Sequence, residues 1–232
     1  MNKTNNKSIK MEKFKREGTL IIVEGVDGSG KSTQMELVGK WLESNGFSIA
    51  YTDWKSSQEL KPLFKKMWRN DIYINPYVFS LLHAADFYQR VNTIIIPALK
   101  IGQIVLCDRY YYTPLVRDVA RGMNPKWVKE LYANAPAPDI AFYFDVPPEI
   151  ALQRKGAKPK YYESGTDLGL GDDRWENYKA FETKQIELYR AIAADKSNNL
   201  TRIDGTGPIP LVSPKTRELV KAFFKKKYNV AF

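Results

Sequence analysis

The chain has little cysteine, little histidine and no long apolar run. Its 232 residues contain one cysteine and one histidine, so Cys107 cannot form a disulfide within the chain. Because Cys107 ends the apolar run that starts at Ile104, we expect a buried strand residue in a reducing compartment rather than a nucleophile. No stretch is apolar for long enough to cross a membrane, and the first residues lack the apolar core of a secretory signal. These absences predict a soluble, cytoplasmic protein without a membrane partner.

The excess of positive charge lies at the two ends of the chain. The formal net charge is +10, but residues 1–18 carry six Lys or Arg against two acids, and residues 214–232 carry six against one. The middle of the chain is therefore nearly neutral, and the basic ends are typical of a solvated leader and an exposed helix face. A nucleic-acid partner is the less favoured interpretation. We expect a disordered basic leader over 1–17 and a single folded domain over 18–232.

Short apolar segments alternate with helical patterns from residue 18 onward. The strand candidates cover residues 19–24, 48–53, 103–108, 139–145 and 199–204. The longest helix candidate runs from Asn75 to Ile101, with Pro76 near its start and Gly102 just after its end, as is usual at helix termini. This alternation predicts an α/β fold: a three-layer α/β/α domain with a five-stranded parallel sheet and helices on both faces.

A complete phosphate-binding loop joins the first strand candidate to the helix that follows it. Its eight residues are Gly25-Val26-Asp27-Gly28-Ser29-Gly30-Lys31-Ser32. In this motif the glycines let backbone N–H groups point at phosphates, the lysine reaches the β and γ oxygens, and the last hydroxyl binds Mg²⁺. The anion also lies at a helix N-terminus, which favours negative charge. The position between a strand and a helix favours nucleotide binding over a glycine-rich turn that binds nothing.

Asp108 and Arg109 follow the third strand candidate. Ligands of such sheets bind beyond the carboxyl ends of the strands, so both residues should lie beside the phosphate loop. Arg109 can hold a phosphate through paired hydrogen bonds, and Asp108 can anchor the shell of a magnesium ion through water. A structural ion pair is the alternative, but the position next to the loop favours a functional role. Ser32 and Asp108 are therefore the expected metal-binding residues.

Residues 155–173 contain helix breakers and little apolar patterning, so we interpret this segment as a lid loop. Basic residues lie at its start and within it: Arg154, Lys155, Lys158 and Lys160. Phosphoryl transfer needs positive charge around the migrating group and exclusion of water, and a closing cationic loop supplies both. The alternative is that these charges only keep a surface loop solvated.

Together these segments resemble the thymidylate kinase family over nearly all of residues 18–230. The matching segments are Val23 to Gln34, Pro138-Asp139-Ile140, Phe144 to Arg154, Asp173-Arg174-Trp175-Glu176 and Ile203-Asp204-Gly205. The resemblance implies transfer of the γ-phosphoryl group of ATP to a deoxynucleoside 5′-monophosphate with Mg²⁺. It also implies a homodimer packed through the long helix.

The resemblance implies roles for individual residues. It places Asp27 near the acceptor sugar, Arg109 on the acceptor phosphate, Arg154 near adenine, and Glu176 near Mg²⁺ and the acceptor. Members with glycine at the position of Gly28 usually rely on a basic lid. We assign catalysis to Lys31, Asp108, Arg109 and Arg154. The expected nucleotide-binding residues are Gly25, Asp27, Gly28, Ser29, Gly30, Lys31, Ser32, Thr33 and Arg154.

The sequence departs from the family where the acceptor base should bind. The family often has Phe-Ala-Ala-Asp-Arg on the long helix, where the phenylalanine stacks on thymine and the arginine bonds its carbonyl. Here the segment is His83-Ala84-Ala85-Asp86-Phe87. His83 can stack and hydrogen-bond, or be a satisfied helix residue, whereas Phe87 cannot donate a hydrogen bond. Another arginine can take that place, and the candidates are Arg90, Arg117 and Arg121.

Two further departures affect the acceptor. Trp54 and Lys55 follow the second strand and either wall the pocket or lie in an exposed loop. Arg117 falls in a segment where the family more often has a tyrosine that disfavours ribose, so the sequence does not predict the choice of sugar. The expected acceptor-binding residues are Asp27, Trp54, His83, Phe87, Arg109, Arg117 and Glu176.

We therefore hypothesise a nucleoside monophosphate kinase that converts dTMP to dTDP by direct in-line transfer, because two highly charged reactants need the loop lysine, Arg109 and a metal to offset their repulsion. One alternative is a kinase for another nucleotide or phosphorylated acceptor. The other is a non-catalytic ATP-binding module that regulates a partner.

Overall fold

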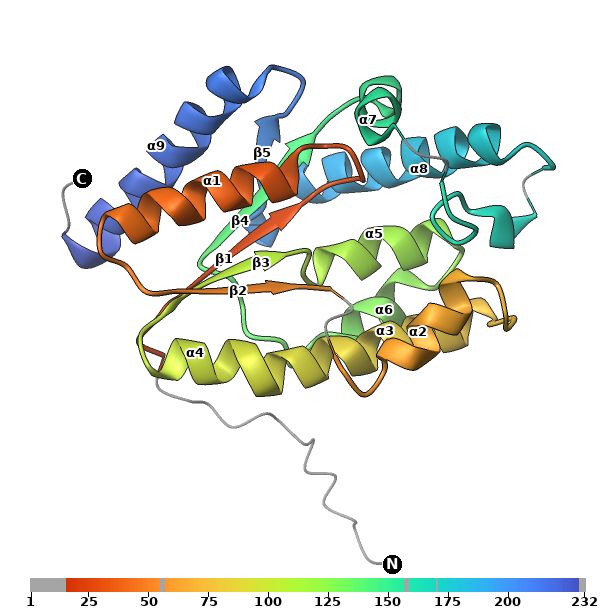
Figure 1. Ribbon diagram of the computed structural model, residues 1–232, viewed down its shortest axis with the longest axis horizontal. Helices are drawn as coiled ribbons and strands as arrows, with labels where there is room; N and C mark the ends of the chain where they lie inside the picture. Colours follow the sequence, from red (N-terminus) through yellow and green to blue (C-terminus); the bar gives the residue numbers. More distant parts are fainter. Residues whose placement is uncertain (1–15, 55–56, 157–158, 170, 230–232) are drawn as a thin grey trace, which may run out of the picture.

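A computed structural model describes residues 16–54, 57–156, 159–169 and 171–229 (Figure 1). Five strands form one parallel sheet in the order β2-β3-β1-β4-β5. They are β1 Thr19–Glu24, β2 Ile49–Asp53, β3 Ile104–Asp108, β4 Ile140–Asp145 and β5 Thr201–Asp204. The predicted five-stranded parallel sheet is confirmed, because each strand begins and ends within two residues of its expected range.

Helices connect the strands and cover both faces of the sheet (Figure 1). In chain order the helical elements are α1 Lys31–Ser44, α2 Lys61–Trp68, α3 Pro76–Arg90, η1 Val91–Ile95, α4 Ile96–Lys100, α5 Tyr112–Ala120, α6 Pro125–Leu131, α7 Pro148–Lys155, η2 Thr166–Leu168, α8 Arg174–Ala194, η3 Lys196–Asn198 and α9 Ile209–Tyr228. The helices α1 and α9 pack on one face, and α3, α4, α5, α6 and α8 pack on the other. The three-layer α/β/α fold is therefore confirmed.

Strand β1 shows how the two layers of core are filled. All of its residues are buried. Leu20 and Ile22 pack with the helices of one face, whereas Ile21 and Val23 pack with α1 and α9 on the other, as the alternation of side chains along a strand requires. A parallel sheet covered on both faces needs apolar residues on both. This explains why the three central strands β1, β3 and β4 are nearly continuous apolar runs, whereas the edge strands β2 and β5 are not.

The predicted long helix is one helical span that contains a π-helical turn. The span begins after Asn75, whose side chain accepts a hydrogen bond of 2.9 Å from the N–H of Val78. Residues Val91–Ile95 form the π-helical turn η1, and α4 follows it. Pro97 has no N–H to donate, and its ring crowds the carbonyl one turn earlier, so a widened turn before it is expected. The span ends before Gly102, which has φ 81°.

The segment expected to be a lid lies folded against the body of the protein. Its described residues form turns and the short helix η2 between α7 and α8. Tyr162 is buried and packs against Phe79 and Trp68, with ring centroids 5.4 and 5.9 Å away. The segment is therefore anchored by an aromatic residue, whereas the sequence indicated mainly its cations.

Some expectations fall outside the described residues: those for residues 1–15 of the leader, for Lys55 and for Lys158.

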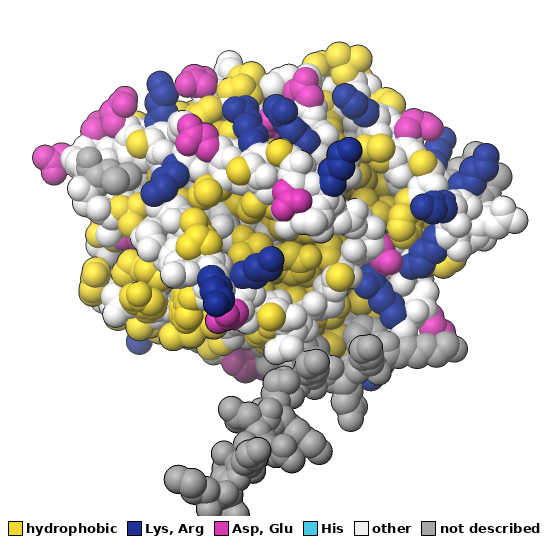
Figure 2. Space-filling model, turned by 180° about the vertical axis from the view of Figure 1, so that it is seen from behind, with side chains coloured by type: hydrophobic (Ala, Val, Ile, Leu, Met, Phe, Trp, Pro, Cys, Tyr) yellow, Lys and Arg dark blue, Asp and Glu magenta, His cyan; other side chains and the backbone are white. Residues whose placement is uncertain are grey.

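Figure 2 shows basic side chains spread over one face of the molecule, with acidic side chains among them. Within the described parts of the chain, every helix is too short or too polar for a membrane span.

Candidate active site

The phosphate loop turns between β1 and α1 at the carboxyl edge of the sheet. Gly28 has φ 86°, and a Cβ atom there would lie 2.2 Å from the carbonyl oxygen of Ala151. The close approach of the loop to α7 therefore excludes any side chain at this position. The Ser29 hydroxyl is buried and has no hydrogen-bond partner among the described residues. It is available to a ligand of the loop.

Lys31 lies at the start of α1 with its side chain buried. Its Nζ atom is 3.3 Å from the carbonyl oxygen of Val26 and 3.5 Å from Oδ1 of Asp27. Burial lowers the pKa of Lys31, and the charge of Arg109 lowers it further. An anion placed between these cations would offset both effects. The site is therefore electrostatically suited to a polyanionic ligand.

Ser32 and Asp108 supply oxygen ligands of the kind that magnesium prefers. The Ser32 hydroxyl donates to Oδ2 of Asp108, and Oδ1 of Asp108 is buried without a hydrogen-bond partner in the described part of the chain. No group of three or more His, Cys, Asp or Glu that could hold a metal occurs among the described residues. Because magnesium is usually held by one or two carboxylates and the phosphates of a substrate, this donor set fits a magnesium ion that arrives with a nucleotide.

A cleft of about 400 Å³ extends from the phosphate loop to the connection between β5 and α9. This size falls within the range of about 300–1,000 Å³ found for small-molecule sites. Arg154 lines the cleft, and its guanidinium donates to the carbonyl oxygens of Gly205 at 2.7 Å and Thr206 at 2.8 Å. The other lining residues are Gly28, Ser29, Gly30, Lys31, Ser32, Thr33, Gln34, Gly205, Gly207, Pro208, Ile209 and Val212. We call this cavity the donor cleft.

A second cavity lies between α3, α5, α8 and the lid, and its free volume is about 90 Å³. Its aromatic wall consists of Trp54, Trp68, Phe79, His83, Tyr162 and Phe181. Its polar lining consists of Asp27, Arg109, Thr113, Arg117, Arg121, Glu163, Glu182 and Gln185. Aromatic rings suit a planar base, and guanidinium groups suit phosphate and carbonyl oxygens. We call this cavity the acceptor pocket.

Asp27 lines the acceptor pocket and lies 3.5 Å from Nζ of Lys31, which lines the donor cleft. Its carboxylate accepts a hydrogen bond from Nη2 of Arg109 and lies 3.8 Å from Nζ of Lys155. Burial acts to raise the pKa of Asp27, but the charges of Arg109, Lys31 and Lys155 outweigh burial and hold it well below its usual range. Asp27 is therefore ionised at neutral pH and joins the lysine of the loop to the arginine that follows β3.

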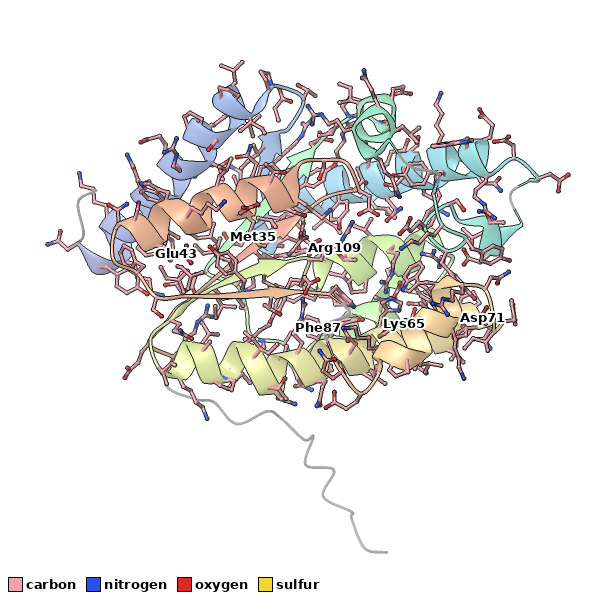
Figure 3. All side chains as sticks on the ribbon, viewed as in Figure 1. Met35, Glu43, Lys65, Asp71, Phe87 and Arg109 are labelled. Carbon is pink, nitrogen blue, oxygen red and sulfur yellow. The ribbon has the colours of Figure 1, made fainter. Side chains whose placement is uncertain are left out.

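Arg109 is held in an unusual backbone conformation, with φ 68°, which few residues other than glycine adopt. Its N–H donates to the carbonyl of Val23 at 2.9 Å, and its own carbonyl accepts from Nη2 of Arg90 at 3.0 Å. Strain of this kind is often found at functional sites. In Figure 3 the labelled Arg109 lies beyond the end of β3, above the labelled Phe87 of α3.

His83 and Trp54 line the acceptor pocket, but Phe87 does not. Nδ1 of His83 lies 2.8 Å from the carbonyl oxygen of Phe79, so His83 is a hydrogen-bonded helix residue, and its stacking on a base stays a prediction. Trp54 is buried rather than exposed. Phe87 lies behind Trp54, with ring centroids 5.5 Å apart, and has no exposed surface. Arg117 places its guanidinium over the rings of Phe79 and Trp54, at 4.7 and 5.7 Å.

Two further expected residues lie away from both cavities. Glu176 is exposed in the first turn of α8, where its N–H donates to Asp173, and it lines neither cavity. Lys160 of the lid is also exposed. Lys155, by contrast, points inward and pairs with Glu163 at 2.9 Å as well as with Asp27. Of the described lysines in residues 155–173, Lys155 is the one that lies beside Asp27.

Sequence reasoning missed several residues of the acceptor pocket, of which Glu182 is the most unusual. Burial, and then the charge of Asp27, raises the pKa of Glu182 to about 8. Its neighbour Gln185 lies one turn further along α8 and lines the same pocket. The sequence did contain a signal for these two pocket residues. Glu182 and Gln185 are polar, yet they lie on the helix face that Tyr178, Phe181 and Ile186 bury.

Comparisons with known proteins agree with the site. The family model for thymidylate kinase matches residues 23–215. "Probable thymidylate kinase 2" of Saccharolobus solfataricus is 40% identical over 207 residues, which cover 88% of this chain and 95% of that protein. "Probable thymidylate kinase" of Pyrococcus abyssi is 35% identical, covering 76% of this chain and 90% of that protein. "Thymidylate kinase" of Pelotomaculum thermopropionicum is 30% identical, with 90% and 97% covered.

Proposed function

The chain belongs to the thymidylate kinase family, and on this premise we propose that it transfers the γ-phosphoryl group of ATP to dTMP, forming dTDP and ADP. Members of this family are nucleoside monophosphate kinases that use ATP as phosphate donor. The observation that carries the proposal is that Asp27, which lines the acceptor pocket and accepts a hydrogen bond from Arg109, lies 3.5 Å from Lys31 of the donor cleft.

In the proposed reaction the phosphates of ATP lie on the loop 25–32, and adenine extends along the donor cleft past Arg154. Ser32 and Asp108 would hold a magnesium ion, which when bound offsets the negative charge of the phosphates. Lys31 contacts the migrating group, and Arg109 binds the phosphate of the acceptor. The acceptor oxygen attacks in line, so no covalent intermediate with the protein is required.

The lid contributes positive charge and excludes water. Lys155 lies 3.8 Å from Asp27 and therefore beside the path between the two phosphates. Tyr162 lines the acceptor pocket and packs against Phe79. Exclusion of water strengthens each electrostatic contact and prevents hydrolysis of ATP. We propose that residues 155–173 act as this lid within a single kinase domain.

The aromatic wall and Arg117 support thymine as the base. The Nη2 atom of Arg117 is buried without a hydrogen-bond partner in the described residues, and the side chain lines the acceptor pocket. A buried donor of this kind can bind a carbonyl oxygen of the base. Arg117 would then bind the thymine carbonyl that an arginine at the position of Phe87 binds in other members of the family.

The test is ADP release from ATP and Mg²⁺ with a panel of acceptors: dTMP, dUMP, dCMP, dAMP, dGMP and the corresponding ribonucleotides. We expect the highest kcat/KM with dTMP. A clear preference for another base would contradict the assignment of thymine and leave the kinase chemistry standing. ATP binding without release of ADP for any acceptor would contradict the kinase itself and favour a regulatory nucleotide-binding module.

We also propose a homodimer packed through α3. Tyr77 and Leu81, one turn apart on this helix, are 59% and 49% exposed. An apolar pair on one helix face is suited to packing against a second copy. Sedimentation should show that Leu81→Glu halves the mass in solution, whereas Leu219→Glu, on the exposed part of α9, leaves it unchanged. A wild-type protein that sediments as a monomer would refute this proposal.

A further inference from the structure

Helix α8 carries polar residues at the point where it passes the acceptor pocket. Its buried residues are Asn177, Tyr178, Phe181, Glu182, Gln185, Ile186 and Tyr189. Glu182 and Gln185 lie one turn apart and both line the pocket. Burial of a carboxyl group costs free energy unless the group finds a partner. Glutamate at position 182 therefore requires a physical explanation.

Glu24 and Glu182 are both buried, but they differ in the hydrogen bonds that their carboxylate oxygens receive. Glu24 is fully buried, and its two oxygens accept hydrogen bonds from the N–H of Tyr110 at 2.7 Å and the hydroxyls of Thr113 at 2.6 Å and Tyr189 at 2.8 Å. Glu182 is only 5% exposed, yet its Oε2 atom has no hydrogen-bond partner in the described part of the chain. The fold supplies hydrogen-bond donors to both oxygens of Glu24, whereas among the described residues Oε2 of Glu182 receives none.

The position of Glu182 along the pocket indicates which part of an acceptor it faces. Nζ of Lys155 lies 3.8 Å from Asp27 and 4.9 Å from the ring centroid of Tyr178, one turn before Glu182 on α8. The charges of Asp27, Arg109 and Lys155 are also those that act most strongly on Glu182, and we place these groups at the phosphate end. Arg117 lies at the other end, over Phe79. Glu182 therefore lies on the phosphate side of the base wall. This is the level at which the sugar of a nucleoside monophosphate would lie.

We propose that Glu182 is a specificity-determining residue that hydrogen-bonds a hydroxyl group of the acceptor's sugar, beside Asp27. This inference rests on the proposed function, because it takes a nucleoside monophosphate as the acceptor. A protonated carboxyl group both donates to and accepts from a hydroxyl. In its neutral form it also adds no negative charge next to Asp27 or the acceptor phosphate. Deoxyribose presents a 3′ hydroxyl to such a group, and ribose presents 2′ and 3′ hydroxyls.

The test combines acceptors that differ by one hydroxyl with variants that differ at one side chain. The acceptors are the 5′-monophosphates of thymidine, 3′-deoxythymidine and ribothymidine, and the measured quantity is kcat/KM for each. Glu182→Leu removes all hydrogen-bonding atoms, and Glu182→Met does so at nearly the original length. Glu182→Gln retains a donor and an acceptor. Thermal unfolding of each variant without nucleotide reports whether it is folded, as we expect, because an apolar residue in place of an unpartnered acid is rarely destabilising.

The expected result is a loss that depends on the presence of one hydroxyl. If Glu182 binds the 3′ hydroxyl, Glu182→Leu lowers kcat/KM about tenfold to a hundredfold for thymidine monophosphate and changes it less than about threefold for the 3′-deoxy acceptor. If it binds the 2′ hydroxyl, the loss is confined to ribothymidine monophosphate. In both cases Glu182→Gln retains most of the activity. Either pattern supports the inference.

Equal losses for all three acceptors would overturn the inference, because a purely structural residue affects every substrate alike. An apolar variant that is as active as the wild type with all three acceptors would overturn it too. These outcomes leave the kinase activity of the wild type standing. A wild-type protein that phosphorylates none of the three acceptors would instead refute the proposed function, and the inference with it.

Discussion

The donor cleft and the acceptor pocket are adjacent, but they are built in different ways. The donor cleft is lined by two short continuous segments, 28–34 and 205–212, together with Arg154, and it has about 400 Å³ of free volume. The acceptor pocket is formed by side chains from several separate elements and has about 90 Å³. Backbone groups recognise phosphate in any nucleotide, whereas side chains distinguish one base or sugar from another. We therefore expect the donor cleft to provide the phosphate chemistry and the acceptor pocket to determine which acceptor is used.

Buried contacts hold the segment 155–173 against the acceptor pocket. Arg121 and Asp167 form an ion pair of 3.0 Å with both side chains almost fully buried. Arg121 also donates to the carbonyl of Tyr162. Because the free volume of about 90 Å³ is below the lower range of about 300 Å³ for small-molecule sites, we expect residues 155–173 to move when a nucleotide binds. The donor cleft needs no such movement.

Loss of the loop lysine should have the largest effect on turnover. We expect Lys31→Ala to lower kcat by at least about a hundredfold, because charge on the migrating phosphoryl group loses its closest cation. Initial rates of ADP release measure this effect. Lys40→Ala, which removes an exposed lysine of the same helix paired with Glu36, is the matched control and should keep nearly full activity. Normal turnover in Lys31→Ala would contradict the assignment.

Loss of Arg109 should affect the acceptor side alone. We expect Arg109→Ala to lower kcat/KM for dTMP by about a hundredfold or more, because paired hydrogen bonds to the acceptor phosphate are lost. Binding of ATP, measured by calorimetry, should change by less than about threefold. Arg109→Lys should not restore activity, because an ammonium group cannot reproduce the paired geometry. Weakened ATP binding in these variants would remove the distinction between the two cavities.

The stability of the protein without ligand should depend on pH through Glu182. Its pKa is about 8 in the folded protein against an ordinary value of 4.5, so between these pH values the folded state binds more protons than the unfolded state. Stability therefore falls as pH rises through this window, by at most about 1.4 kcal/mol per pH unit. Glu182→Gln should remove this contribution. Denaturant unfolding at pH 5 and pH 8 should show the variant gaining stability relative to wild type at the higher pH, and parallel curves would contradict the assignment.

Loss of the lid anchor should have the smallest of these effects. We expect Tyr162→Ala to lower kcat/KM for dTMP by about five- to tenfold, because the aromatic contacts that hold the lid closed are lost. Tyr162→Phe keeps the ring against Phe79 and serves as the control, with activity within about twofold. ATP binding should be unchanged in both. An effect of Tyr162→Ala on ATP binding as large as that on dTMP would mean that the lid serves both cavities equally.

The same contrast explains how much was predictable from the sequence. The strands, the phosphate loop, Asp108 and Arg109 depend on local patterns and on their position at the ends of strands, and the structure places these elements as expected. The acceptor pocket depends on which side of each helix packs inward. Phe87 lies behind Trp54, and Glu182 rather than Glu176 faces the pocket. The rotation of α8 is set by its long-range packing, which short motifs do not encode.

Binding of a bisubstrate compound tests most directly whether the two cavities form one active site. In such a compound adenosine and thymidine are joined through their 5′ positions by a polyphosphate chain. If the donor cleft and the acceptor pocket meet at Asp27, the compound should bind at least about a hundredfold more tightly than ATP or dTMP alone, because the second contact becomes intramolecular. An affinity no better than that of the tighter single nucleotide would contradict the account.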